Sequence, residues 1–148
     1  MSPLPAMLSE TISELRVRYA ETDQMGVVYH ANYLVWCELG RTDFIRARGK
    51  SYAELERDGL LLAVSDVTMR FHASARYDDP IRVHTRLTAA GSRGLTFAYR
   101  VMRADTDTLL VSATTALVSI DKSGRLAAMP RDMRAILEAA VMPTDHGR

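Results

Sequence analysis

The stretch TDQMGVVYHANY, residues 22–33, places a carboxylate, a glycine and an imidazole close together just before a long run without proline. Asp23 stands in the turn, and the run begins near Ala31. A helix start offers unpaired N–H groups and the positive end of the helix dipole, which stabilise an oxyanion without a charged side chain. A nearby carboxylate can attack a carbonyl or activate water. Acyl transfer needs this combination, and one oxyanion donor is typically worth about 10²–10³ in rate.

The same residue types also fit a role without chemistry. An aspartate before a helix commonly caps it or accepts hydrogen bonds within a turn. Gly26 lets the backbone bend closely between the acid and the helix in either case. The residues alone therefore leave two interpretations of Asp23 open, a reacting carboxylate and a turn residue.

The elements that would position these groups can be predicted along the chain. A β-like run at 11–19 precedes the turn, and a helix is predicted from about 31 to 48, where Gly49 is a stop signal. Apolar residues lie on nearly every face of this helix, so we expect other structure to surround it. A short helical or irregular piece is expected at 51–59.

Four β-like runs follow, at about 60–76, 81–90, 94–104 and 108–121. Their spacing, with turn residues between them, predicts an antiparallel meander. In the second run, apolar residues alternate with Arg82, His84 and Arg86, which predicts one buried face and one polar face. A surface helix is predicted at 130–141.

One strand, a long helix and then a set of strands predict an α+β fold in which a curved antiparallel sheet wraps a long central α-helix. The 148 residues fit a single domain, 1–148, with its core at about 13–141. Because an open sheet leaves edges that a second chain could cover, we expect a homo-oligomer.

Composition argues against several classes of function. A net charge of +1 gives no general attraction to nucleic acid or anionic lipid, and the most apolar run, LLVSATTALVSI, is too short for membrane insertion. Cys37 is the only cysteine and is expected in the core, which suits a reducing compartment. His72 and His84 stand beside arginines as solvated or interface side chains, and we expect no metal site. The first residues do not resemble a signal peptide, so a cytoplasmic location is expected.

The segment RVRYAETDQMGVVYHANYLVWCELGRTDF resembles the signature of the 4-hydroxybenzoyl-CoA thioesterase family of hotdog-fold proteins, in particular its Tol-Pal-associated acyl-CoA thioesterase branch. The likeness runs through Arg16-Val17, Thr22-Asp23, Gly26-Val27-Val28, Tyr29-His30 and Tyr33, and then Glu38 and Arg41. A later segment, ARYDDPIRVHTRL, resembles the family's second recurring segment. The resemblance implies a hotdog fold, hydrolysis of an acyl-CoA thioester to a free acid and CoA without a cofactor, and a dimer or a tetramer built from two dimers.

The resemblance also implies roles for single residues. Asp23 would be the catalytic carboxylate, as nucleophile or as general base, and backbone N–H groups near Tyr29 and His30 would form the oxyanion hole. Tyr19 and His30 would line the reacting centre. The other substrate-binding candidates are Gly26, Val28, Asn32, Tyr33 and Glu38. For Glu38 a structural ion pair with Arg41 and support of the site both stay open.

The phosphates of coenzyme A need basic groups near the mouth of such a site. The candidates are Arg76, Arg93, Lys122 and Arg125, each of which also fits an ordinary solvated charge. Two other functions remain open, a non-catalytic acyl-CoA-binding hotdog protein and a hotdog dehydratase or hydratase. The sequence does not predict whether the acyl group is aliphatic or aromatic, or whether CoA or a carrier protein bears it.

Overall fold

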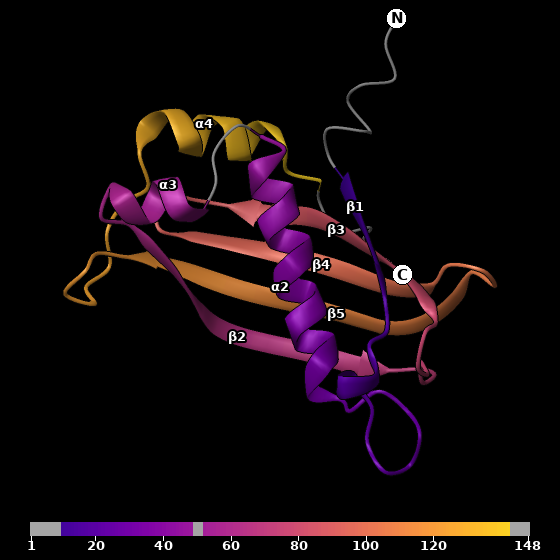
Figure 1. The fold of residues 1–148 in the computed structure, drawn as a ribbon. Coiled ribbons are helices and arrows are strands. Elements are labelled where there is room, and N and C mark those ends of the chain that lie inside the picture. The colour runs from indigo at the N-terminus through magenta and orange to yellow at the C-terminus, as the bar shows by residue number, and fades with distance from the viewer. Residues whose placement is uncertain (1–9, 49–51, 143–148) are drawn as a thin grey trace, which may run out of the picture.

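The computed structural model describes residues 10–48 and 52–142, which form one sheet with helices packed against it (Figure 1). The chain begins with β1 (Glu10–Arg16), the 3-10 helix η1 (Tyr19–Glu21), α2 (Ala31–Arg46) and α3 (Tyr52–Arg57). It continues with β2 (Leu61–Phe71), β3 (Pro80–Ala90), β4 (Gly94–Arg103), β5 (Thr108–Ile120) and α4 (Arg131–Ala139). The predicted α+β architecture, a curved antiparallel sheet around a long helix, is confirmed.

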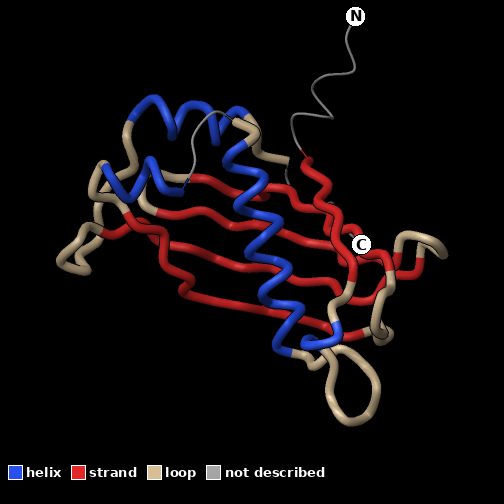
Figure 2. Tube along the Cα trace, viewed as in Figure 1, coloured by secondary structure: helices blue, strands red, loops and turns tan. Residues whose placement is uncertain are grey.

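The strand order is β1-β3-β4-β5-β2, and all four pairings are antiparallel (Figure 2). The predicted meander is correct for β3, β4 and β5 but wrong for β2, which pairs with β5 at the edge of the sheet. The predicted run 60–76 also ends early, at Phe71, because the chain then turns across the end of the sheet. There the amides of His72 and Ala73 both donate to the Leu110 carbonyl.

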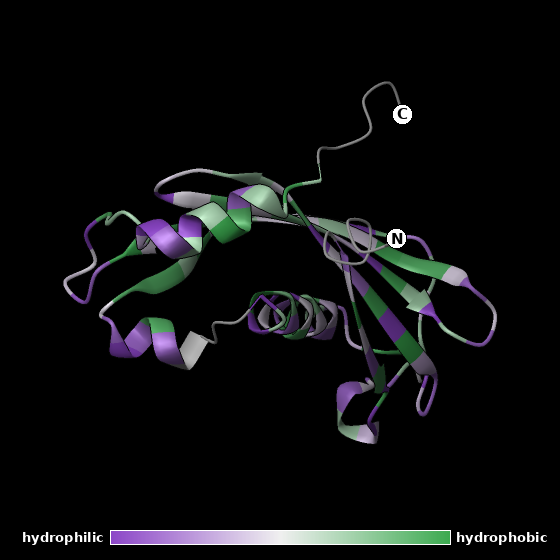
Figure 3. Cartoon of the chain, turned by 90° about the horizontal axis from the view of Figure 1, so that it is seen from above, coloured by the Kyte–Doolittle hydropathy of each residue, from purple (hydrophilic) through white to green (hydrophobic). Residues whose placement is uncertain are grey.

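One face of α2 packs into the concave side of the sheet (Figure 3). The side chains of Tyr33, Trp36 and Phe44 are buried on this face. Gly40 allows the close approach to β3, because a Cβ at this position would overlap Thr85 Oγ1. The prediction that Cys37 belongs to the core is confirmed, and desolvation by burial raises the pKa of its thiol to about 12.

The opposite face of α2 is left open by a single chain. Leu34, Val35 and Leu39 on this face are 39–51% exposed, although the sequence predicted a helix that other structure surrounds. The edge strand β2 likewise exposes Val67 and Phe71. Two neighbouring apolar surfaces of the described chain therefore lack a cover.

Candidate active site

A cavity of about 320 Å³ lies at the N-terminal end of α2. Three segments line it: the loop before α2 with Asp23 and Val28, the helix start with His30 and Tyr33, and the 71–74 segment that follows β2. The rings of His30 and Phe71 meet edge to face, with centroids 6.2 Å apart. The structure therefore brings the candidate acid, the candidate histidine and the helix start to one cavity.

Asp23 is held in a tight turn. Its Oδ1 accepts a 2.8 Å hydrogen bond from the Met25 amide, and its carbonyl accepts one from the amide of Gly26, where φ is +81°. This is the bonding of an Asx turn, and the positive φ explains the glycine. Oδ2 of Asp23 forms no hydrogen bond with any described residue, so one carboxylate oxygen is not used by the turn.

Some backbone amides at the start of α2 already donate hydrogen bonds to described residues, and others do not. Tyr29 N–H donates to the Glu21 carbonyl at 2.9 Å, and Asn32 N–H donates to the Tyr29 carbonyl. The amides of His30 and Ala31 form no hydrogen bond with a described residue. Because the Tyr29 amide is occupied, the candidate oxyanion donors are those of His30 and Ala31.

Glu21 anchors the loop that carries Asp23, a role that sequence reasoning missed. Its side chain is only 6% exposed and accepts hydrogen bonds from Trp36 Nε1 at 2.9 Å and from the Arg18 amide at 2.8 Å. Desolvation raises the pKa of this carboxyl, but the hydrogen bonds from Arg18 and Trp36 outweigh it, and the net shift is downward. The carbonyl of Glu21 also accepts from the Asn32 side chain, so Asn32 orients the loop.

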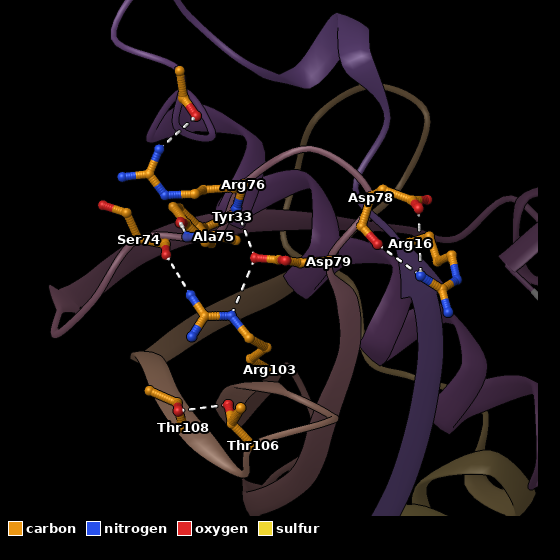
Figure 4. A network of polar contacts seen from close by, with 11 residues as sticks. Arg16, Tyr33, Ser74, Ala75, Arg76, Asp78, Asp79, Arg103, Thr106 and Thr108 are labelled. Atoms are coloured by element: carbon orange, nitrogen blue, oxygen red, sulfur yellow. Dashed lines mark hydrogen bonds and ion pairs between the residues drawn. The ribbon is translucent and has the colours of Figure 1, made fainter.

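A second network of polar contacts, drawn in Figure 4, holds the 72–79 connection, whose residues 72–74 line the cavity. The Tyr33 hydroxyl accepts a 3.0 Å hydrogen bond from the Ala75 amide, and the Ala75 carbonyl accepts from Val28 N–H. Arg103 donates from Nε to Asp79 at 3.1 Å and from Nη2 to the Ser74 carbonyl at 2.7 Å. These contacts join the 72–79 connection to both α2 and the Asp23 loop. The pattern of charges around 76–79 gave no indication of this role for Arg103.

Two other candidates lie away from the cavity lining. Tyr19 is 76% exposed and contacts the edge of Tyr77. Glu38 is exposed on α2 and does not line the cavity. Arg41 is buried beside Cys37 and Tyr99.

The four candidates for phosphate binding fall at two ends of the sheet. Arg76 is near the Asp23 loop, since its Nη1 lies 3.5 Å from the Gly26 carbonyl. Arg93 precedes β4, and its carbonyl accepts from the Ser119 amide at the end of β5, close to Lys122 and Arg125. The Asp23 cavity lies at the Phe71 end of β2, and this strand spans roughly 35 Å. One chain therefore does not bring these three residues to the cavity.

Two further observations on the described residues concern metal binding and membrane insertion. Within residues 10–48 and 52–142, no group of three or more His, Cys, Asp or Glu side chains is placed to hold a metal ion. In the same ranges, no helix has the length and apolar character needed to cross a membrane.

Comparison with known proteins places the chain in a family. Residues 17–137 match the model of the thioesterase-like superfamily. The acyl-CoA thioester hydrolase YbgC of Escherichia coli is 35% identical over 107 residues, which are 72% of this chain and 79% of that protein.

Two solved structures resemble the fold closely. The hypothetical protein TT1821 of Thermus thermophilus is 37% identical with a TM-score of 0.84, over 90% of this chain and 98% of that one. The DHNA-CoA thioesterase of Staphylococcus aureus is 30% identical with a TM-score of 0.82, over 88% and 87% of the two chains. The fold is the hotdog fold, and the chain belongs to the thioesterase-like superfamily.

Proposed function

We propose that this protein hydrolyses acyl-CoA thioesters to a free carboxylic acid and CoA at the cavity beside Asp23. Its membership of the superfamily and its likeness to named thioester hydrolases make it an enzyme of the thioester hydrolase class. The observation that carries the proposal is the meeting of the Asp23 carboxylate with the unused amides of His30 and Ala31 at one helix start.

The proposed reaction uses these groups in a fixed order. The thioester carbonyl oxygen lies at the amides of His30 and Ala31, which stabilise the negative charge that develops there. Asp23 either attacks the carbonyl carbon and forms an anhydride that water then cleaves, or takes a proton from the water that attacks. In both routes the C–S bond breaks, CoA leaves as the thiol, and one water molecule is consumed.

The narrower assignments are part of the same proposal. Membership of the Tol-Pal-associated branch rests on the motif around Asp23, and a cytoplasmic location rests on the single cysteine and the composition. A non-catalytic binding protein would have no need of a carboxylate with an oxygen free of its turn, so Asp23 favours the hydrolase. A dehydratase would require its acid and histidine in a different sequence arrangement.

The proposal is tested by a screen for thiol release from acyl-CoAs of increasing chain length, from aromatic acyl-CoAs and from acyl carrier protein thioesters. We expect hydrolysis of at least one class, with kcat/KM in the ordinary enzymatic range of about 10⁴–10⁸ M⁻¹s⁻¹. Binding of acyl-CoA without thiol release from any substrate would contradict it and would favour the binding protein.

A second copy of the chain would complete this site. Antiparallel pairing of two β2 edges would cover Val67 and the open face of α2. It would also bring the Arg93 end of one chain beside the Asp23 end of the other, because paired antiparallel strands run in opposite directions. We therefore still expect the basic turn residues Arg93, Lys122 and Arg125 to contact the CoA phosphates, but only within a homodimer or a tetramer of two such dimers.

We expect light scattering at micromolar concentration to give the mass of a dimer or a tetramer. Replacing Val67 by lysine puts a charge into the apolar edge and should shift the mass toward the monomer with a parallel loss of activity. The matched change Thr114→Lys, at an exposed position of β5 inside the sheet, should leave the mass unchanged. A wild-type monomer would contradict the assembly.

Reversing the charge at Arg93 or Arg125 should raise KM for acyl-CoA more than it lowers kcat. Contacts with distant phosphates supply binding that is similar in the ground state and in the transition state. Steady-state kinetics on both variants checks this expectation. An unchanged KM in both would remove these arginines from the CoA site.

A further inference from the structure

A second cavity, of about 470 Å³, lies on the face of the sheet opposite α2. Its lining includes Arg70 from β2, Arg86 from β3 and Arg100 from β4, together with His72 and His84. We call this cavity, defined by these five residues, the arginine groove. The proposed hydrolysis assigns no role to its three arginines.

The strand register explains why the three arginines share one face of the sheet. His84 pairs with Arg100, Arg100 pairs with Ser112, and Ser112 pairs with Arg70. Directly paired residues of antiparallel strands point to the same face, and neighbouring strands lie about 4.8 Å apart. The register thus places Arg70 and Arg100 on one face with only Ser112 between them, and Arg86, paired with Ala98, points to the same face.

Among the described residues, the protein supplies one counter-charge to the groove, Glu10, which stands opposite Arg86 in the β1–β3 ladder. Arg70, Arg86 and Arg100 form no ion pair within residues 10–48 and 52–142, and Nε of Arg86 is buried without a hydrogen-bond partner. Glu10 is the one carboxylate among the lining residues of the described chain, and it lies 3.7 Å from His84 Nδ1. A buried donor without an acceptor is unfavourable, and a bound anion would remove that cost.

The floor of the groove carries one small side chain and several hydroxyl groups that can form hydrogen bonds. Ala98 lies between Arg86 and Thr114 in the ladder, and its short side chain leaves a hollow between the longer ones. The hydroxyls of Thr68, Ser112 and Thr114 border the same space. Arginine guanidinium and Ser or Thr hydroxyl groups are the side chains that commonly bind phosphate oxygens.

We propose that the arginine groove binds a nucleotide through its pyrophosphate group. Three unpaired guanidinium groups match the charge of a nucleoside diphosphate, about −3 at neutral pH because the second pKa of a phosphate is near 6. The volume also lies within the range of about 300–1,000 Å³ that is usual for small-molecule sites.

The pyrophosphate can come from a free nucleotide or from the nucleotide part of CoA. His72 lines both the groove and the Asp23 cavity, and its Nε2 lies 2.9 Å from Ser112 Oγ. The two cavities therefore adjoin, so that one acyl-CoA could extend from Asp23 into the groove, an arrangement alternative to contact of its phosphates with Arg93 and Arg125. This second source rests on the proposed function, whereas binding of a free nucleotide does not.

Calorimetric titration of the intact protein with ADP and with CoA tests the site without turnover. The double variant Arg70→Gln/Arg100→Gln should bind both at least about tenfold more weakly than the wild type. Arg82→Gln is the matched control: Arg82 is on β3 on the same face, but it lies outside the groove and 3.6 Å from Glu14. Its affinity should stay within about twofold of the wild type.

Kinetics then separates the two sources. If CoA is the ligand, the double variant raises KM for acyl-CoA but leaves KM for the matching acyl-pantetheine unchanged. If a free nucleotide is the ligand, ADP binding falls and both KM values stay the same. The inference is overturned if the wild type does not bind ADP or CoA, if the double variant binds them equally well, or if sulfate binds as tightly as ADP. A lack of hydrolysis by the wild type would contradict the proposed function alone.

Discussion

The variant Glu21→Ala is expected to lose about 3 kcal/mol of stability and most of its thioesterase activity. The mutation leaves Trp36 Nε1 buried without an acceptor and frees the Arg18 amide. Hydrogen bonds to a charged group are worth about 1.5–3 kcal/mol each, and an unsatisfied buried donor costs about 1–3 kcal/mol. Activity should fall because the loop that holds Asp23 loses its anchor. Urea unfolding and thiol release on one preparation measure both effects.

Two further variants make this prediction specific. Glu14→Ala removes an acid of the same chain that is 74% exposed and only loosely paired with Arg82, so its stability should change by less than about 0.5 kcal/mol. Glu21→Gln keeps an acceptor for Trp36 and should be less damaging than alanine. Equal stability of the wild type and Glu21→Ala would show that the loop does not depend on this carboxylate.

The pH dependence of stability follows from the same residue. The folded protein lowers the pKa of Glu21 below 4.5, the value of a free glutamate side chain. The stabilisation from its charge is therefore fully present above that value and is lost as the pH falls through the folded pKa. The stability difference between wild type and Glu21→Gln should accordingly shrink on acidification. A difference that grows toward low pH would contradict the assignment.

Some elements could be predicted from the sequence because a local pattern determines them. The long helix starts at Ala31 as predicted, since a run without proline follows a turn with glycine. The alternation in β3 correctly places Val83 and Thr85 in the core and His84 on the other face. Asp23 and His30 meet at one cavity because both lie within a few residues of the helix start.

Other features depend on contacts that a local pattern does not encode. Nothing in the β2 segment specifies β5 rather than β3 as its partner, so the edge position and the end at Phe71 were missed. The role of Glu21 depends on Trp36, 15 residues further along, and an acid within a polar turn gives no indication of burial. The apolar residues around α2 could not indicate whether the cover is this chain or a second copy.

Asp23→Asn is expected to lower kcat by at least roughly 10²-fold while the fold and acyl-CoA binding are kept. Asparagine preserves the size of the side chain and its hydrogen-bond acceptor, but it removes the charge needed for attack or for proton transfer. The Oδ1 that accepts from the Met25 amide is retained. The amides of His30 and Ala31 are also unchanged, so the substrate should still bind.

The chain contains a close control for this substitution. Asp121 forms the same kind of turn, with Oδ1 2.8 Å from the Ser123 amide and its carbonyl accepting from the Gly124 amide. Asp121→Asn therefore makes the same chemical change in the same backbone geometry, at the end of the sheet opposite the Asp23 cavity of the same chain. If Asp23 is only a turn residue, the two variants should behave alike.

The most direct test of the account is the kcat for thiol release by Asp23→Asn, compared with Asp121→Asn and wild type on a substrate for which chemistry limits the rate. Thermal unfolding and acyl-CoA binding are measured on the same preparations. We expect Asp121→Asn to match the wild type in kcat and Asp23→Asn to fall at least roughly 10²-fold with its ligand affinity retained. A folded Asp23→Asn protein with turnover within about threefold of wild type would contradict the assignment of Asp23 as the catalytic carboxylate.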